Sequence, residues 1–165
     1  MTFEESFVLE MAGELTLLPD DLAAPSGLEI VRVENEESLR KWIHVASTGF
    51  GVPQEFGGAW YDFFEAAVFN APFQNYLALL SGQPVATSQL FTSAGVAGIY
   101  NVTCLPNARN QGIGASIARA PMMDARAMGY RIGILQASEL GYRVYRRLGF
   151  QDYGKLSVYL WENEG

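Results

Sequence analysis

Three apolar segments in the middle of the chain constrain its fold most, because only short turns separate them. Residues 76–80, 85–91 and 96–104 each have the length of a strand, and the turns fall at 81–84 and 92–95. Gly82 in the first turn can adopt the positive φ that a tight hairpin requires. Consecutive strands joined by short turns pair in antiparallel fashion. The chain is therefore expected to build its sheet around an antiparallel meander.

The residues before the meander predict one strand and two helices. Residues 28–33 alternate well enough for a strand, and Asn35 is a good N-cap for a helix that follows. Apolar residues then recur at helical spacing at Leu39, Trp42, Ile43 and Ala46. A second helix is expected after Gly57 and Gly58, with apolar residues at helical spacing at Trp60, Phe63, Phe64 and Ala67 and a core stripe of Trp60 and Phe63. Residues 1–26 are expected to form an N-terminal extension that could add a strand, ahead of a main domain over 27–165.

The residues after the meander predict a strand–helix–strand unit followed by another helix and strand. We expect a helix from about 112 to 128, a strand over 131–136 and a final strand or strands within 150–161. Ser138 would cap a helix whose core face carries Leu140, Val144 and Leu148. The chain is thus expected to be α/β, with a mixed, mostly antiparallel sheet of about six to seven strands flanked by about four helices.

Composition excludes several functional classes. The chain has 165 residues, one cysteine and one histidine, so neither a disulfide nor a metal site is expected. The net charge of −7 argues against non-specific nucleic-acid binding. The first residues are acidic, and no apolar run approaches the length of a membrane span. We therefore expect a cytoplasmic protein that binds neither nucleic acid nor a membrane.

The stretch 106–115 carries the clearest chemical signal. A strand ends there, a short loop follows, and Gly112 and Gly114 open a helix. Free N–H groups at a helix N-terminus bind anions, and glycines let a phosphate approach the backbone. Arg109 could add a charged donor to the same anion. A P-loop would need a lysine near Gly114, and a dinucleotide fingerprint would need a third glycine where Ile117 stands, so both fit poorly.

The pattern Arg109-x-x-Gly112-x-Gly114 resembles the acetyl-coenzyme A signature of the GNAT acyltransferase superfamily. A second block resembles the same family, and it comprises Gln136-Ala137-Ser138, Gly141, Tyr145 and Leu148-Gly149-Phe150. The resemblance implies a sheet that splays at the strand before the loop. It also implies direct attack of an acceptor amine on the thioester of acetyl-coenzyme A, with no metal. The acceptor would be a small amine, and a homodimer is left open.

The resemblance also assigns roles to individual residues. Tyr145 would protonate the departing thiolate, although a packing tyrosine is the alternative. The residues expected to bind the cofactor are Val102, Thr103, Cys104, Arg109, Asn110, Gln111, Gly112, Ile113, Gly114, Ala115 and Ser138. Ser138 stands where the family often has asparagine. Three aromatic residues, Phe50, Phe56 and Tyr61, could line the acceptor cleft.

The general base stays unassigned. Tyr100 and Asn101 occupy a strand position where some family members carry a carboxylate, so the base would be a water chain, Asp62, Glu65 or Glu139. The missing carboxylate leaves open a non-catalytic acyl-coenzyme A binding module. A third interpretation is that residues 1–26 derive from a larger tandem arrangement whose substrate site needs a partner chain.

Overall fold

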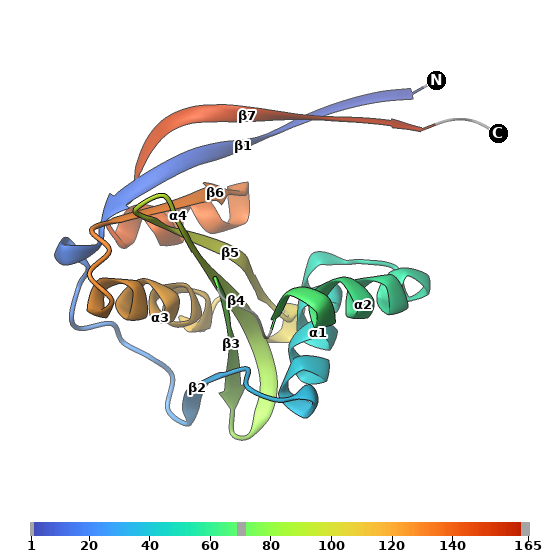
Figure 1. Ribbon diagram of the computed structural model, residues 1–165, viewed down its shortest axis with the longest axis horizontal. Helices are drawn as coiled ribbons and strands as arrows, with labels where there is room; N and C mark the ends of the chain where they lie inside the picture. The colour runs from blue at the N-terminus through green and yellow to red at the C-terminus, as the bar shows by residue number, and fades with distance from the viewer. Residues whose placement is uncertain (1, 69–71, 163–165) are drawn as a thin grey trace.

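The computed structural model describes residues 2–68 and 72–162, which form a single mixed sheet with helices on both faces (Figure 1). The strand order is β2-β3-β4-β5-β6-β1-β7, and every neighbouring pair is antiparallel except β5 and β6. The strands are β1 (Thr2–Glu14), β2 (Leu28–Arg32), β3 (Phe73–Leu80), β4 (Gln83–Ser93), β5 (Val96–Cys104), β6 (Ile132–Ala137) and β7 (Gln151–Glu162). The helices are α1 (Glu36–Phe50), α2 (Gly57–Val68), α3 (Ile113–Ala127) and α4 (Glu139–Arg147). This arrangement confirms the predicted fold class.

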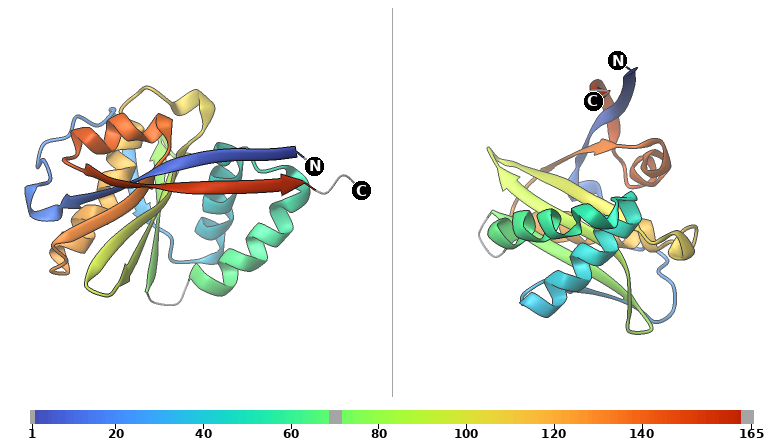
Figure 2. Two further views of the ribbon diagram at one scale, coloured as in Figure 1. Left: turned by 90° about the horizontal axis from the view of Figure 1, so that it is seen from above. Right: turned by 90° about the vertical axis from the view of Figure 1, so that its right-hand side faces the viewer.

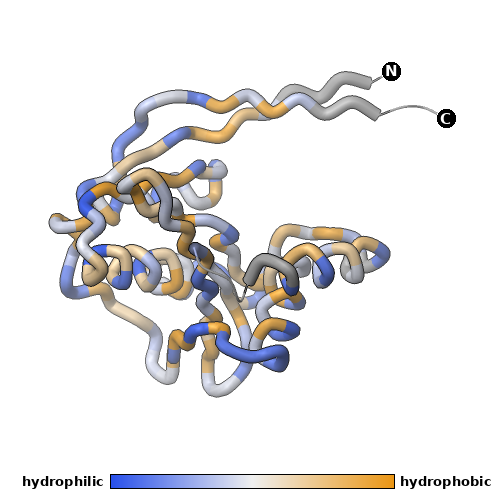
Figure 3. Tube along the Cα trace, in the orientation of Figure 1, coloured by the Kyte–Doolittle hydropathy of each residue, from blue (hydrophilic) through white to orange (hydrophobic). Residues whose placement is uncertain are grey.

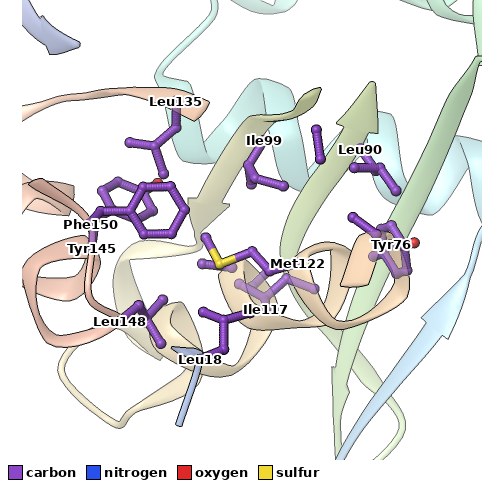
Figure 4. Packing of buried hydrophobic residues seen from close by; sticks show 14 of the residues in the cluster. Leu18, Tyr76, Leu90, Ile99, Ile117, Met122, Leu135, Tyr145, Leu148 and Phe150 are labelled. Carbon is purple, nitrogen blue, oxygen red and sulfur yellow. The ribbon is translucent and has the colours of Figure 1, made fainter. Parts of the chain in front are cut away.

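The helices pack as two layers, α1 and α2 on one face and α3 and α4 on the other (Figure 1). The α3 layer covers the larger core, where Ile117 and Met122 are fully buried between the sheet and the helix (Figure 4). The α1 layer covers a smaller core around Trp42, whose ring meets Phe64 of α2 edge-on at 4.9 Å. The predicted caps are confirmed: Asn35 forms a capping box at α1, and the Ser138 side chain accepts from the Gly141 amide at α4.

Two predicted core residues are exposed instead. Phe63 is 69% exposed, because α2 turns Phe64 toward Trp42. Leu140 is 81% exposed, because the ring of Tyr145 reaches back over the first turn of α4. A Cβ added at Gly141 would lie only 2.8 Å from that ring. Side chains on a helix lean toward its N-terminus, so Tyr145 covers the inner side of this turn and leaves Leu140 outside.

The N-terminal segment lies inside the sheet, between β6 and β7. Residues Leu9–Glu14 of β1 pair with β6, while nearly the whole strand pairs with β7. Gly13 permits this, because a Cβ there would meet the buried Phe150 ring at 2.8 Å. Beyond the end of β6, β1 and β7 continue as a two-stranded ribbon that projects from the body toward both termini (Figure 2). Apolar residues continue along both strands of this ribbon (Figure 3), and Phe7 is 51% exposed.

Candidate active site

The centre of the candidate site is a wedge between β5 and β6. The two strands pair only from Val96–Gly98 to Ile132–Ile134, although β5 continues to Cys104 and β6 to Ala137. Among the residues that the structure describes, the edge of β5 that faces β6 therefore has no ladder partner past Gly98. The predicted splay is confirmed, and it exposes backbone groups inside the wedge.

A β-bulge between β4 and β5 accounts for the splay. The register shifts between Thr87 and Gln89, opposite Asn101 of β5. Asn101 has a φ of +51°, and its carbonyl accepts a hydrogen bond from the Thr87 hydroxyl at 2.9 Å. A bulge bends its strand and increases the local twist. The second half of β5 is thereby turned away from β6.

The loop after β5 leads into the N-terminus of α3 at the open end of the wedge. Gly112 is the N-cap, with a φ of +82° and no side-chain cap. The first hydrogen bond of the turn runs from the Ser116 amide to the Gly112 carbonyl at 3.2 Å. Within the described residues, the amides of Ile113, Gly114 and Ala115 therefore have no acceptor. Such a triplet, at the positive end of the helix dipole, favours an anion.

The two glycines of this loop differ, since the backbone requires glycine at Gly112, whereas a Cβ at Gly114 would make an ordinary contact. A side chain at Gly112 would be strained by the positive φ, and its Cβ would lie 3.4 Å from the Ala23 carbonyl oxygen. A Cβ at Gly114 would lie 3.7 Å from the Cys104 sulfur. The start of α3 therefore lies close to the end of β5, and the wedge and the free amides form one continuous site.

Arg109 is held by the protein itself. Its Nε donates to the Cys104 carbonyl at 3.2 Å, and its Nη2 donates to the Gly49 carbonyl at 3.1 Å. The arginine thus ties the loop to the end of β5 and the end of α1. Its expected contact with the bound anion stays a prediction. Gln111 is likewise engaged, since its Nε2 donates to the Asn107 carbonyl at 3.0 Å, whereas the Asn110 side chain is exposed.

Tyr145 reaches the wedge from α4. It is buried, and its ring lies beside that of Phe150 (Figure 4), with ring centroids 6.4 Å apart. Its hydroxyl forms no hydrogen bond with any residue that the structure describes. Burial, together with the nearby Cys104 thiol, raises the pKa of Tyr145 well above its usual value. The hydroxyl therefore keeps its proton and has no protein acceptor competing for it.

The three predicted cofactor residues at the end of β5 differ in environment. Burial raises the pKa of the Cys104 thiol to about 11, so this cysteine is a poor nucleophile near neutral pH. Val102 packs against the larger core, and Thr103 lies against Gly49, where an added Cβ would be 2.5 Å from the threonine Oγ1. Ser138, at the end of β6, already accepts from the Gly141 amide at 3.3 Å.

The three predicted acceptor residues do not converge. Tyr61 lines a cavity of about 420 Å³ beside α1, where it stacks on the Arg40 guanidinium at 4.8 Å and its hydroxyl lies 3.3 Å from Glu65. Phe50 packs against Trp60, with ring centroids 6.5 Å apart, and does not line that cavity. Phe56 is 52% exposed and does not line it either.

The sequence did not predict a row of three hydrogen-bonded side-chain amides, of which Gln89 and Asn75 are buried. Asn101 Nδ2 donates to Gln89 Oε1 at 3.0 Å, and Gln89 Nε2 donates to Asn75 Oδ1 at 2.9 Å. The row crosses β5, β4 and β3, and it ends on the buried Asn75 Nδ2, which has no partner in the described structure. The signal in the sequence was the presence of polar amides within apolar strands. The carboxylates considered as bases, Asp62, Glu65 and Glu139, are all exposed.

No helix within residues 2–68 and 72–162 is long and apolar enough to cross a membrane. The same residues contain no group of three metal-ligating side chains that could hold an ion.

Several solved structures share this fold. A GCN5-related N-acetyltransferase from Kribbella flavida is 23% identical, with a TM-score of 0.72, over 95% of this chain and 58% of that one. One from Sphaerobacter thermophilus is 22% identical, with a TM-score of 0.77, over 93% of this chain and 50% of that one. A predicted acetyltransferase from Clostridium acetobutylicum, solved with acetyl-CoA, is 18% identical, with a TM-score of 0.64, over 76% of this chain and 91% of that one.

The chain spans only half to about three fifths of the Kribbella and Sphaerobacter proteins. No curated protein matches it. The sequence model of the family described as acetyltransferase (GNAT) domain matches residues 30–152 of the chain. These residues include the whole wedge, the α3 N-terminus and Tyr145. The chain therefore belongs to the GNAT acetyltransferase family.

Proposed function

We propose that the chain transfers an acetyl group from acetyl-coenzyme A to the primary amine of a small acceptor, by direct attack of that amine. One observation carries the proposal. The wedge between β5 and β6 opens onto three free amides of α3, and a protonated tyrosine without a hydrogen-bond partner reaches the same wedge. We infer that the three amides bind an anion, that the unpaired edge of β5 binds the pantetheine and that Tyr145 is the acid.

The residues present fit coenzyme A. A pyrophosphate is an anion, and the amides of Ile113, Gly114 and Ala115 offer donors with no side chain in the way. The unpaired edge of β5 from Val102 to Cys104 offers backbone donors and acceptors that suit the amide groups of pantetheine. When bound, the cofactor supplies an acetyl thioester.

The side chains of the site support direct attack rather than an acetyl-enzyme. Cys104 is a protonated thiol, and His44 is an exposed residue of α1 outside the wedge. Tyr145 Oη holds a proton that it can transfer to the departing thiolate. The free backbone amides on the β5 edge are suited to stabilise the oxyanion that forms on attack.

The N-terminal half of the chain, which we assign to the acceptor, is acidic overall. Among its described residues no carboxylate is buried. Residues 1–100 carry 3 basic and 13 acidic side chains, whereas residues 101–165 carry 8 basic and 5 acidic ones. This asymmetry favours a cationic amine on the N-terminal half and an anionic cofactor on the C-terminal half. The side-chain oxygen of Asn101 can accept a hydrogen bond from an amine, but a side-chain amide is too weak a base to take the proton of that amine. We therefore assign proton removal to water.

The first test is ligand selectivity. Acetyl-coenzyme A should raise the melting temperature, while NAD and ATP should not, because only a ligand of the native state stabilises it. Gly112→Asp should abolish that shift by placing a side chain and a negative charge among the free amides. Gly129→Asp is the matched control, since Gly129 has a φ of +93° at the other end of α3. Equal shifts with all three ligands, or an unchanged shift in Gly112→Asp, would contradict the assignment.

The second test separates catalysis from binding alone. Thiol release from acetyl-coenzyme A is followed over a panel of small primary amines, with carboxylic acids and alcohols of the same size as controls. Amine-dependent release supports the acetyltransferase. Tight binding without release for any amine would favour an acyl-coenzyme A binding module, which the absence of a buried carboxylate base would permit.

A further inference from the structure

A second cavity, of about 610 Å³, lies on the α3 face of the sheet at its β2 edge. Three alternate residues of β2, Leu28, Ile30 and Arg32, point into it, as expected for one face of a strand. One flank of α3, from Ser116 to Asp124, forms the opposite wall. The segment that joins η1 (Leu15–Leu17) to β2 passes beside α3 and closes the remaining side through Leu22 and Ala24 (Figure 1).

This cavity shares no lining residue with the wedge, although Ser116 directly follows the free amides of α3. The strand order places three strand spacings between β2 and β5, which amount to about 14 Å. None of the residues predicted to bind the cofactor or the acceptor lines the cavity. Its volume falls within the range of small-molecule sites in proteins, roughly 300–1,000 Å³.

The walls divide into an apolar part and a charged part. The apolar part consists of Leu22, Leu28, Ile30, Ala120 and Met123. In the charged part, Asp124 Oδ2 accepts from Arg32 Nε at 3.1 Å and Nη2 at 2.5 Å, and from the Tyr76 hydroxyl at 2.7 Å. The Arg32 charge is thus balanced by Asp124.

Arg119 supplies a positive charge that no carboxylate balances within the described residues. Its Nε donates to the Pro19 carbonyl at 2.8 Å, and its Nη2 donates to the Asp20 carbonyl at 2.9 Å. Both acceptors are neutral backbone groups, so neither offsets the positive charge of Arg119 at the cavity wall. An arginine held in this way has a fixed orientation, and its remaining nitrogen, Nη1, is available to a ligand.

We propose that this cavity is a second ligand site, for a small organic anion with an apolar body, such as an arylalkyl carboxylate. The apolar body lies against the walls from β2 and α3, and the carboxylate pairs with Arg119. A cation of the same shape is disfavoured, because the net charge of the lining is positive. The site does not depend on the proposed acetyltransferase activity.

The test uses three probes of one shape on the full chain: 4-phenylbutanoate, 4-phenylbutanamide and 4-phenylbutylamine. Ligands of this size bind weakly, so we expect a Kd on the order of 1 mM for the acid. The amide should bind about tenfold more weakly, and the amine more weakly still. Titration followed by amide chemical shifts should place the largest changes in Leu28–Arg32 and Arg119–Asp124, and not in Val102–Cys104 of the wedge.

Two variants test the walls separately. Ala120→Phe fills the apolar part and should weaken binding of the acid at least tenfold, whereas Ala127→Phe, on the exposed end of α3, should not. Arg119→Gln should bring the acid and the amide to similar affinity. The proposal is overturned if no probe binds, if the wild type binds the amide as tightly as the acid, if coenzyme A competes with the acid, or if the shift changes cluster at the wedge. All four results come from the wild type and do not depend on whether a variant folds.

Discussion

Replacing Tyr145 by phenylalanine tests the assignment of the acid most directly. The ring keeps its place, 6.4 Å from Phe150, and the lost hydroxyl makes no hydrogen bond with any described residue. The free energy of unfolding should therefore change by less than about 0.5 kcal/mol. Binding of coenzyme A should also be unchanged within about twofold, because the proton is needed only as the C–S bond breaks.

The expected loss is in turnover. General acid catalysis contributes roughly 10²–10⁴-fold, which corresponds to about 3–5 kcal/mol in the activation barrier. Because the pKa of Tyr145 is raised, the wild-type enzyme should lose no activity through its deprotonation as the pH rises to about 9. The assay is thiol release at saturating acetyl-coenzyme A, with an acceptor identified from the amine panel.

Tyr142 provides the matched control on the same helix. Its hydroxyl donates to Asp152 at 2.9 Å, so Tyr142→Phe removes a tyrosine hydroxyl that is tied to the surface of the protein. This variant should keep wild-type turnover. Full activity in a folded Tyr145→Phe variant would make Tyr145 a packing residue. A loss of coenzyme A affinity at unchanged turnover would make its hydroxyl a cofactor contact instead, with water as the acid.

Three further predictions concern stability. Phe150→Ala empties a site that is 1% exposed, and it should lower the free energy of unfolding by about 3–5 kcal/mol in urea denaturation; a loss below about 1 kcal/mol would show that the core collapses around the gap. Asn35→Ala removes the capping box of α1 and should cost about 1 kcal/mol, while Asn35→Asp should restore most of it. Deletion of residues 2–14 takes away the partner of both β6 and β7, so the chain should lose its cooperative thermal transition; a native-like transition would mean that β1 is dispensable.

Local features of this fold could be predicted from the sequence because they depend on residues close together in the chain. The caps at Asn35 and Ser138 bond to amides three residues away, and the loop from Arg109 to Gly114 carries Gly112 where the backbone needs a glycine. The meander and the start of α3 could be predicted for the same reason. The two blocks that revealed the family are also short and local.

Other features depend on contacts between distant segments, which periodicity does not report. Arg109 is bound to the carbonyl of Gly49, and Arg32 to the carboxylate of Asp124, and only the packed structure brings each pair together. The place of β1 between β6 and β7 follows from pairing across more than one hundred residues of chain. Even within one helix, tertiary packing determined that Phe64 is buried and Phe63 is exposed, because the ring of Trp42 lies on only one side of α2. Local backbone chemistry thus determined the elements and the glycine-containing loop before α3, whereas the wedge, the amide row and the second cavity exist only once the strands have paired and the helices have packed on them.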